Sequence, residues 1–538
     1  MKRRERTGWW ALAVIFLMVG SSPALADDMV FDADDDDMVF DSFDDIEHLE
    51  ELIAEGKDLY DQGAFEEASL RFFDVLMDTE WGAEAYHPEA TYELAKTLFR
   101  LELYQGALAY FGMIAEEGDF HPYFEPALRG LLLLSDVIPG DSTLTEHLSR
   151  YADYFPEIVP DGYRDRYAYL VGRYFYDSLD VEDAVRLLNQ VSSASDDFAE
   201  ARYVAGISHV ANYDAEPAVE AFRDVLRYLS NQPTPLDQMR GRQRQLLDLT
   251  HLAMARVYYS TGQFDTSLAY YERIDRESPR WPDALFESSW GFFQTDQFNQ
   301  ALGNLHSLNS PFFADAYFPE GPILAAVIYF YNCNYGLVRD VLLDFDFIYD
   351  GIKDEIEAVL REYPSPMDLY DWGLQWRQRQ VTGEPELMSA LRSELGDRQL
   401  AQRFELVEAI DREEEVMEGL SESWRASILG DTLLGEAGLA RSFAVSDAGE
   451  LLEQRLRRLV SEIDDLVGQQ NRILIEVARA ERGEIEAELR AGMLLEGEES
   501  QVAQIQVSDE DLYWLFDGEY WKDELGFYFF DIRSQCRR

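Results

Sequence analysis

The sequence predicts an all-α protein in which a helical solenoid is followed by a further helical region. Small side chains recur at an interval of 34 residues, at positions 172 and 206, 184 and 218, and 267 and 301. A fixed interval of this length is typical of stacked helix pairs. Apolar residues between 452 and 480 alternate steps of four and three, which indicates a long helix with a heptad seam. With 47% hydrophobic residues, the chain can bury a core along most of its length.

Residues 1–26 have the pattern of a secretory signal peptide. A basic start is followed by an apolar run from Trp9 to Gly20 and by the A-x-A site at 24–26. The alternative is a membrane anchor, but the apolar run is shorter than the roughly 20 residues that a spanning helix needs. We therefore expect a mature chain that begins at Asp27, has a charge near −62 in place of −59, and is soluble outside the cytoplasm.

Residues 27–50 predict a disordered acidic segment. They hold 12 Asp and Glu residues and no Lys or Arg, and the hexamer at 27–32 recurs at 36–41. Asp32, Asp34 and Asp36 have the spacing of a calcium loop, but Asp37 and Phe43 stand where such a loop needs Gly and Glu. The sequence therefore predicts a solvated tail, with its Met-Val-Phe patches as an alternative docking motif.

Residues 51–352 predict about seven helix pairs, with a degenerate pair at 124–155. Small residues are expected where two helices cross closely, and bulky residues fill the groove between them. The small residues are Gly56, Gly63, Ala68, Ala95, Ala107, Gly172, Ala184, Gly206, Ala218, Ala255, Gly262, Ala301 and Ala326. Between the two helices, where Gly is frequent, the seven units carry Gly63, Glu102, Leu179, Tyr213, Gly262, Asp296 and Cys333.

These segments resemble the tetratricopeptide repeat (TPR) family over roughly residues 51–352. Seven matches in phase make the resemblance specific, although the Trp that is usual near the start of a repeat is missing and some intervals stretch to 37, 39 and 49 residues. The resemblance implies a concave groove lined by the first helix of each pair, which binds peptides or partner domains. In this chain we expect Arg and Tyr side chains to make those contacts.

Residues 364–495 predict a helical, coiled-coil region. The seam runs through Leu452, Leu456, Leu459, Ile463, Leu466, Gln470, Ile473, Val477 and Ala480, and the polar Gln470 can fix its register. One interpretation is an intramolecular hairpin, in which the stretch around Phe404 packs on the seam and Gly430, Gly435 and Gly438 form the turn. The alternative is a homo-oligomer that pairs through residues 452–480.

The tail at 509–538 is rich in aromatic residues. The pattern predicts strand or loop on both sides of a turn at 517–518, and a strand at 527–532. Such a tail either packs back on the helices or docks a partner through Trp514, Phe516, Tyr520 and Trp521. In an exported protein Cys333 and Cys536 can form a disulfide, and the alternative is that Cys333 is a small buried residue of its repeat.

The extreme acidity excludes two classes of partner. A net charge of −59 repels nucleic acid and anionic lipid headgroups. The sequence does not distinguish adaptation to salt from a GC-rich genome as the origin of this composition. We find no catalytic or metal-binding motif, the seven histidines have no ligand spacing, and no cofactor is expected.

These observations favour an exported, non-enzymatic scaffold or adaptor. It would assemble a protein complex in the periplasm or at the surface of a Gram-negative-type bacterium, with other proteins and envelope machinery as partners. Two alternatives are a protein that binds cell-wall glycan through its aromatic residues and a structural element that self-assembles through the heptad seam.

Overall fold

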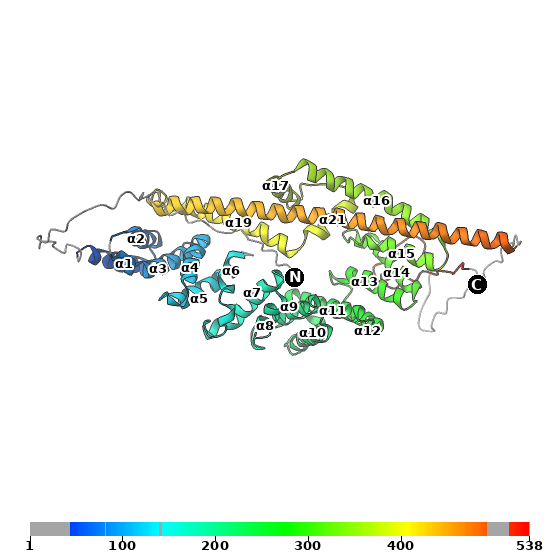
Figure 1. The fold of residues 1–538 in the computed structure, drawn as a ribbon, viewed down its shortest axis with the longest axis horizontal. Helices are drawn as coiled ribbons and strands as arrows, with labels where there is room; N and C mark the ends of the chain where they lie inside the picture. The colour runs from blue at the N-terminus through cyan, green and yellow to red at the C-terminus, as the bar shows by residue number, and fades with distance from the viewer. Residues whose placement is uncertain (1–43, 81, 139–141, 492–515, 537–538) are drawn as a thin grey trace, which may run out of the picture.

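The computed structural model describes residues 44–80, 82–138, 142–491 and 516–536, and within these ranges all regular structure is helical. The expected signal peptide at 1–26, residues 27–43, the polar segment after 491 and Trp514 lie outside the described residues. The predicted all-α, TPR-like fold is confirmed: successive helices pack as pairs, and neighbouring pairs pack on one another (Figure 1).

The solenoid consists of eight helix pairs within the described residues. The first helices are α1 (Asp44–Gln62), α3 (His87–Arg100), α5 (Phe124–Leu134), α7 (Arg164–Asp177), α9 (Phe198–Ala211), α11 (Gly241–Ser260), α13 (Trp281–Gln294) and α15 (Glu320–Tyr331). The second helices are α2 (Phe65–Met77), α4 (Tyr104–Glu117), α6 (Ser142–Ser149), α8 (Val181–Leu188), α10 (Ala215–Ser230), α12 (Phe264–Tyr271), α14 (Phe298–Leu308) and α16 (Tyr335–Glu362).

The first helix begins earlier, and the last ends later, than the sequence indicated. Helix α1 begins at Asp44, so the end of the expected acidic tail is helical. Leu49 is buried there and joins a small core with Ile53 and Val75, which supplies the apolar stripe that a disordered segment lacks. Helix α16 continues to Glu362, since the first proline that could stop it is Pro364.

The C-terminal region consists of α17 (Pro366–Arg377), α18 (Pro385–Leu395), α19 (Arg398–Gly419), the short α20 (Glu422–Arg425) and the 64-residue α21 (Ile428–Ala491). At 1.5 Å per residue, α21 is roughly 96 Å long. Side chains at the N-caps help to start three of the shorter helices. Ser365, Asp397 and Ser421 accept hydrogen bonds from the amides of Asp368, Leu400 and Trp424.

The predicted glycine turn is wrong. Helix α21 runs without a break through Gly430, Gly435 and Gly438, and the chain turns between α19 and α21. Gly430 allows a close approach: a Cβ there would lie 2.4 Å from the carbonyl oxygen of Trp424. A glycine that serves such a contact does not end a helix, and exposed glycines weaken a helix by only about 1 kcal/mol.

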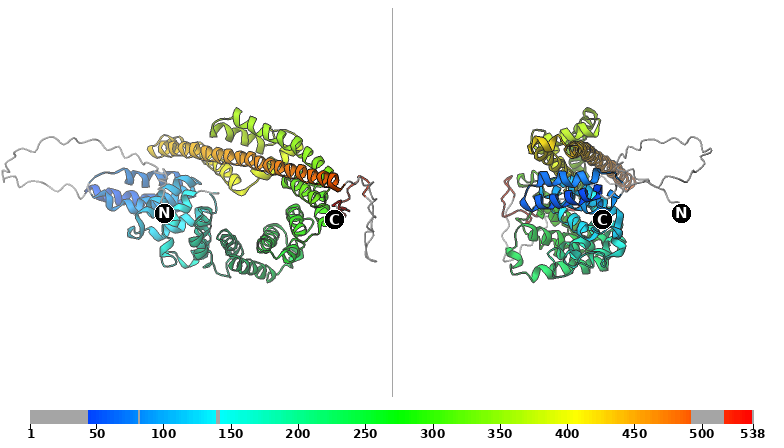
Figure 2. Two further views of the ribbon diagram at one scale, coloured as in Figure 1. Left: turned by 45° about the vertical axis from the view of Figure 1, so that its right-hand side comes forward. Right: turned by 90° about the vertical axis from the view of Figure 1, so that its left-hand side faces the viewer.

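Helix α21 spans the arc of the solenoid and contacts both of its ends. Figure 2 shows the helix pairs curving below α21. Near the first end, a Cβ on Gly106 of α4 would lie 3.1 Å from Leu433 of α21. Near the other end, Leu466 and Val477 of α21 share a buried cluster with Leu342 and Phe345 of α16. The long helix therefore closes the arc as a strut.

The same contacts cover the heptad seam within the chain. Leu452, Leu456, Leu459, Ile463 and Leu466 are buried, and the helices packed along α21 are α15, α16, α17, α18 and α19. Gln470 is buried and donates a hydrogen bond from Nε2 to the carbonyl oxygen of Leu342, 3.1 Å away. The favoured interpretation, in which the seam packs within the chain, agrees with these contacts. The alternative of a homo-oligomer paired through residues 452–480 does not fit this fold, because α15–α19 already cover the buried part of the seam.

The described part of the tail forms no strand, contrary to the prediction. Its backbone instead bonds to the last repeats: Phe530 donates to the carbonyl oxygen of Asn299 at 3.2 Å, and Gln535 to that of Asn332 at 2.8 Å. A strand needs a neighbouring strand to satisfy its alternating backbone groups, and in the described residues this segment lies only beside helices.

Candidate functional site

The small residues of the repeat pattern hold the helix pairs together. Gly172 and Gly206 let Leu188 and Phe222 come so close that an added Cβ would meet them at 2.8 and 2.4 Å. Gly56 does the same for Phe72, at 2.6 Å. The alanines of the pattern are fully buried: Ala68, Ala95, Ala107, Ala184, Ala218, Ala255, Ala301 and Ala326. These positions are structural and are closed to a partner.

The turn between the two helices has the same backbone conformation in the seven clear units. The residues between the two helices in the seven clear units all have positive φ, between +56° and +81°. Two backbone hydrogen bonds close each turn, for example from Tyr213 and Asp214 to the carbonyl oxygens of Val210 and His209. Gly63 and Gly262 suit this conformation, whereas the other five units place a side chain in it.

The first helices α7, α9, α11 and α13 form the inner face of the arc. In Figure 1 they lie between α19 and the outer second helices α8, α10 and α12. Arg256 of α11 binds Glu287 of α13 through two hydrogen bonds of 2.8 and 2.6 Å. Tyr271 donates to the same carboxylate at 2.9 Å. The Arg256 side chain remains 58% exposed, so this rigid pair is accessible to a partner.

A second polar cluster lies on the inner face between α7, α9 and α11. Arg242 binds Glu200, and the hydroxyl of Tyr169 donates to Glu200 at 3.3 Å. Arg166 reaches Asp197 at 3.4 Å. Burial raises the pKa of Asp197, with Arg166 opposing this effect. The inner face thus presents ion pairs held in fixed positions on a strongly acidic molecule.

The chain's own C-terminal helices face part of this surface. Arg398, the first residue of α19, is influenced by the charge of Arg173 on α7, and burial together with this repulsion lowers the pKa of Arg398. Arg392 of α18 pairs with Asp315, before α15, at 2.6 Å. The concave groove implied by the resemblance is therefore shared between the first helices and α18–α19. These two approaches, between side chains that are 225 and 77 positions apart along the chain, have no periodic signal in the sequence.

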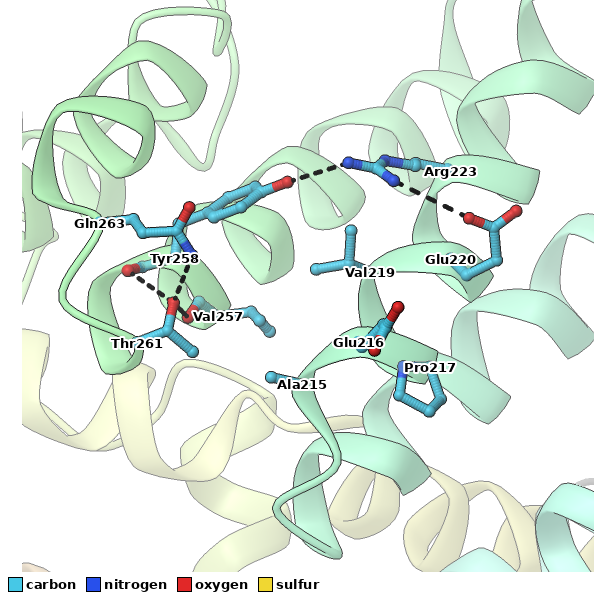
Figure 3. A pocket seen from close by; sticks show the side chains of 10 residues that line it. All are labelled: Ala215, Glu216, Pro217, Val219, Glu220, Arg223, Val257, Tyr258, Thr261 and Gln263. Atoms are coloured by element: carbon cyan, nitrogen blue, oxygen red, sulfur yellow. Dashed lines mark hydrogen bonds and ion pairs between the residues drawn. The ribbon is translucent and has the colours of Figure 1, made fainter.

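A hollow of about 520 Å³ lies between the start of α10 and the end of α11. Figure 3 shows its walls: Ala215, Pro217, Val219 and Val257 are apolar, and Glu216, Glu220, Arg223, Tyr258, Thr261 and Gln263 are polar. Arg223 donates to the hydroxyl of Tyr258 at 3.3 Å and lies 3.9 Å from Glu220. The hollow is next to the turns at Tyr213 and Gly262, at one edge of the solenoid.

The described tail packs on the last repeats and leaves several aromatic rings exposed. Leu525 is buried with Leu252 and Leu285, while Phe516 and Tyr520 contact the ring of His306. Burial lowers the pKa of His306. Among the residues expected to dock a partner, Phe516 is 46% exposed and Trp521 is 57% exposed, whereas Tyr520 is half-buried.

A disulfide between Cys333 and Cys536 fixes the end of the described tail, with an S–S distance of 2.06 Å. Cys333 occupies the positive-φ turn between α15 and α16. Asn334, next to it, donates from its side chain to the carbonyl oxygen of Arg533 at 2.9 Å. The bond closes a loop of 203 residues that holds the last repeat, the C-terminal helices and the tail together.

The described residues also bear on metal binding and on membrane insertion. No group of three or more His, Cys, Asp or Glu side chains there is arranged to hold a metal ion. None of the helices in the described ranges has both the length and the apolar character that a membrane crossing needs.

Comparisons with known proteins yield similarities only among solved structures. No protein-family model and no curated protein matches the chain. The chain is similar to a tetratricopeptide repeat protein from Parabacteroides merdae, with 14% identity, 56% of this chain and 93% of that chain covered, and a TM-score of 0.24. It is similar to the apo form of RapI, with 12% identity, coverage of 73% and 98%, and a TM-score of 0.33.

A TPR protein from Thermus thermophilus is similar at 19% identity, with coverage of 46% and 99% and a TM-score of 0.16. Scores this low carry no argument about function. What identifies the fold of this chain as TPR-like is its own helix pairing and its uniform turns.

Proposed function

We propose that this protein is an exported scaffold that holds partner proteins on the inner face of its arc during assembly of a cell-envelope complex. The observation that carries the proposal is the set of fixed, accessible Arg–carboxylate groups on successive first helices, above all Arg256 with Glu287. Such groups are preorganised, so a partner that binds them loses little free energy to their ordering.

The strut α21 supports a scaffolding role. A solenoid whose pairs contact only their neighbours flexes along its length, whereas here α21 contacts α4 near one end and α15 and α16 at the other. The inner face therefore keeps one curvature. A fixed curvature positions two bound partners relative to each other without any chemical step.

The disulfide and the leader-like start of the sequence support export. Disulfides persist in oxidising compartments and are rare in the cytosol. We expect protein purified from its native cells to begin at Asp27 and to carry an oxidised Cys333–Cys536 pair. Intact-mass measurement under non-reducing and reducing conditions tests both points, and a retained leader with free thiols would contradict export.

Crosslinking in living cells tests the inner face. A photo-crosslinking amino acid replaces Arg256, and in a matched control it replaces Arg227 on α10, whose side chain is 62% exposed. We expect the inner-face probe to capture specific envelope proteins that the control does not capture. Capture of the same proteins from both positions, or of peptidoglycan alone, would overturn the proposal.

A further inference from the structure

One edge of the solenoid carries exposed apolar side chains in its turns. Leu179, between α7 and α8, is 84% exposed, and Tyr213, between α9 and α10, is 96% exposed. The two residues occupy equivalent positions in neighbouring pairs, so they lie along the same edge. Val210, one turn before Tyr213, is 42% exposed and extends the apolar surface.

Neither side chain is explained by folding. Leu179 has φ +63° and Tyr213 has φ +62°, a conformation that L-residues adopt only with strain and that glycine adopts freely. Neither residue belongs to a buried apolar cluster within the described part of the chain. The turn requires this conformation in all seven clear units, so folding explains the positive φ but not the choice of a large, exposed apolar side chain at these two positions.

The hollow between α10 and α11 continues this edge. Ala215 follows the turn at Tyr213, and Thr261 and Gln263 flank the turn at Gly262 (Figure 3). Its volume of about 520 Å³ lies within the range of natural ligand sites. Its apolar wall of Ala215, Val219 and Val257 can receive one large apolar side chain.

The acidic side chains along this edge indicate which residues should flank the apolar side chain of a bound segment. Asp177, Asp180 and Asp214 flank the two turns, and Glu216 and Glu220 line the hollow. Arg223 is the one cation among the ten lining residues, and Glu220 and the hydroxyl of Tyr258 already hold it. A segment that fits this surface therefore carries positive charge on both sides of its apolar residue.

We propose that the edge formed by Leu179, Val210, Tyr213 and the α10–α11 hollow docks a basic segment of a protein partner. One aromatic or large aliphatic side chain of that segment enters the hollow, and flanking Lys or Arg residues pair with the carboxylates. This surface is separate from the inner face and stands whether or not the proposed scaffold function holds.

A labelled heptapeptide with a central Trp and two Arg residues on each side provides the probe, with a central-Ala peptide for comparison. Fluorescence anisotropy at near-physiological ionic strength measures binding to the oxidised full chain. We expect the Trp peptide to bind more tightly than the Ala peptide. We expect the double variant Leu179→Gly, Tyr213→Gly to weaken Trp-peptide binding about tenfold.

The control double variant is Glu102→Gly, Asp296→Gly, which relieves the same backbone strain at turns without apolar side chains. We expect it to keep the binding, and we expect both double variants to unfold at or above the wild-type temperature. Replacing the central Trp with a photo-crosslinking residue should label segments 215–223 and 257–263. Equal binding of the two peptides, or unchanged binding to the Leu179→Gly, Tyr213→Gly variant, would overturn the proposal.

An inner-face variant separates this test from the proposed scaffold function. Arg256→Ala removes the accessible pair on α11 but leaves the turns and the hollow intact. Peptide binding should be unaffected by this substitution, and a loss of binding would place the peptide on the inner face instead, which would contradict the edge proposal.

Discussion

Helix α10 and helix α21 are both held by close packing, but over very different distances along the sequence. Phe222 of α10 packs on Gly206 of the preceding helix, only 16 positions away. Trp424 of α20, the short helix just before α21, donates a hydrogen bond to Ser69 of α2, 355 positions away. The comparison shows that local contacts build the repeats, whereas a few remote contacts set the curvature of the arc.

Among the substitutions that test the remote contacts, Trp424→Ala is expected to lower the free energy of unfolding the most. The side chain is fully buried, and its Nε1 donates to Ser69 Oγ at 3.0 Å. Truncating a buried Trp costs about 3–5 kcal/mol. We expect urea unfolding to show this loss and hydrogen exchange to rise in α2 and in the first turns of α21, with little change in α9 and α10.

Trp521→Ala is the matched control, because this Trp is 57% exposed on the tail. Its effect on stability should stay within about 0.5 kcal/mol. Equal effects of the two substitutions would mean that Trp424 does not hold the arc to its strut.

Glu413→Gln probes a second remote contact through its pH dependence. The Glu413 carboxylate accepts hydrogen bonds from the amides of Gln105 at 2.8 Å and Gly106 at 3.4 Å, at the start of α4. Burial raises the pKa of Glu413 from 4.5 to about 7, against the opposing effect of these hydrogen bonds. The folded chain therefore binds this proton more readily than the unfolded chain does.

Protonated Glu413 therefore stabilises the folded wild type relative to ionised Glu413. This stabilisation is fully present below about pH 4.5 and is lost as the pH rises to about 7. Glutamine carries no charge at any of these pH values. The free energy of unfolding of the variant, relative to that of the wild type, should therefore rise by up to about 3 kcal/mol from about pH 4.5 to about pH 7. Urea unfolding at a series of pH values measures the difference. Glu415→Gln, at an exposed neighbouring position, should show no such trend, and a parallel trend in the two variants would rule out the buried carboxylate as its source.

Gly206→Ala tests a local contact, the one between α9 and α10 within a single helix pair. An added Cβ would lie 2.4 Å from the ring of Phe222, so α9 and α10 must move apart or the ring must shift. Overpacking of this kind costs about 1–3 kcal/mol. Faster hydrogen exchange should be confined to α9, α10 and their neighbours. Adding Phe222→Leu should restore part of the loss, and strictly additive effects would show that the two residues do not contact each other.

The sequence predicted the repeats well because their contacts are local. The interval between Gly172 and Gly206 located the helix crossings, and the pattern located the turn residues, including Leu179 and Tyr213. It did not show that these two residues are almost fully exposed, since aromatic and aliphatic residues in such a pattern usually pack inward. Their positive φ is a property of the turn and not of the residue type.

The remote contacts could not be predicted in the same way. Nothing around Arg398 indicates that it faces Arg173, because the two lie on helices that meet only when the arc closes. The tail at 527–532 has the composition of a strand, but its partners are helices and a disulfide at Cys333. In both cases the structure depends on a neighbour that no spacing in the sequence specifies.

Gly435→Ala is expected to have the smallest effect, and it separates the two kinds of glycine in α21. Gly435 is exposed within the helix, and no heavy atom would lie within 4 Å of an added Cβ. Alanine restricts the unfolded chain more than glycine does, so the variant should gain about 0.5–1 kcal/mol in urea unfolding. Gly430→Ala should have the opposite sign, because its Cβ would meet the carbonyl oxygen of Trp424 at 2.4 Å. Effects of the same sign at both positions would mean that the close approach between Gly430 and Trp424 does not anchor the strut.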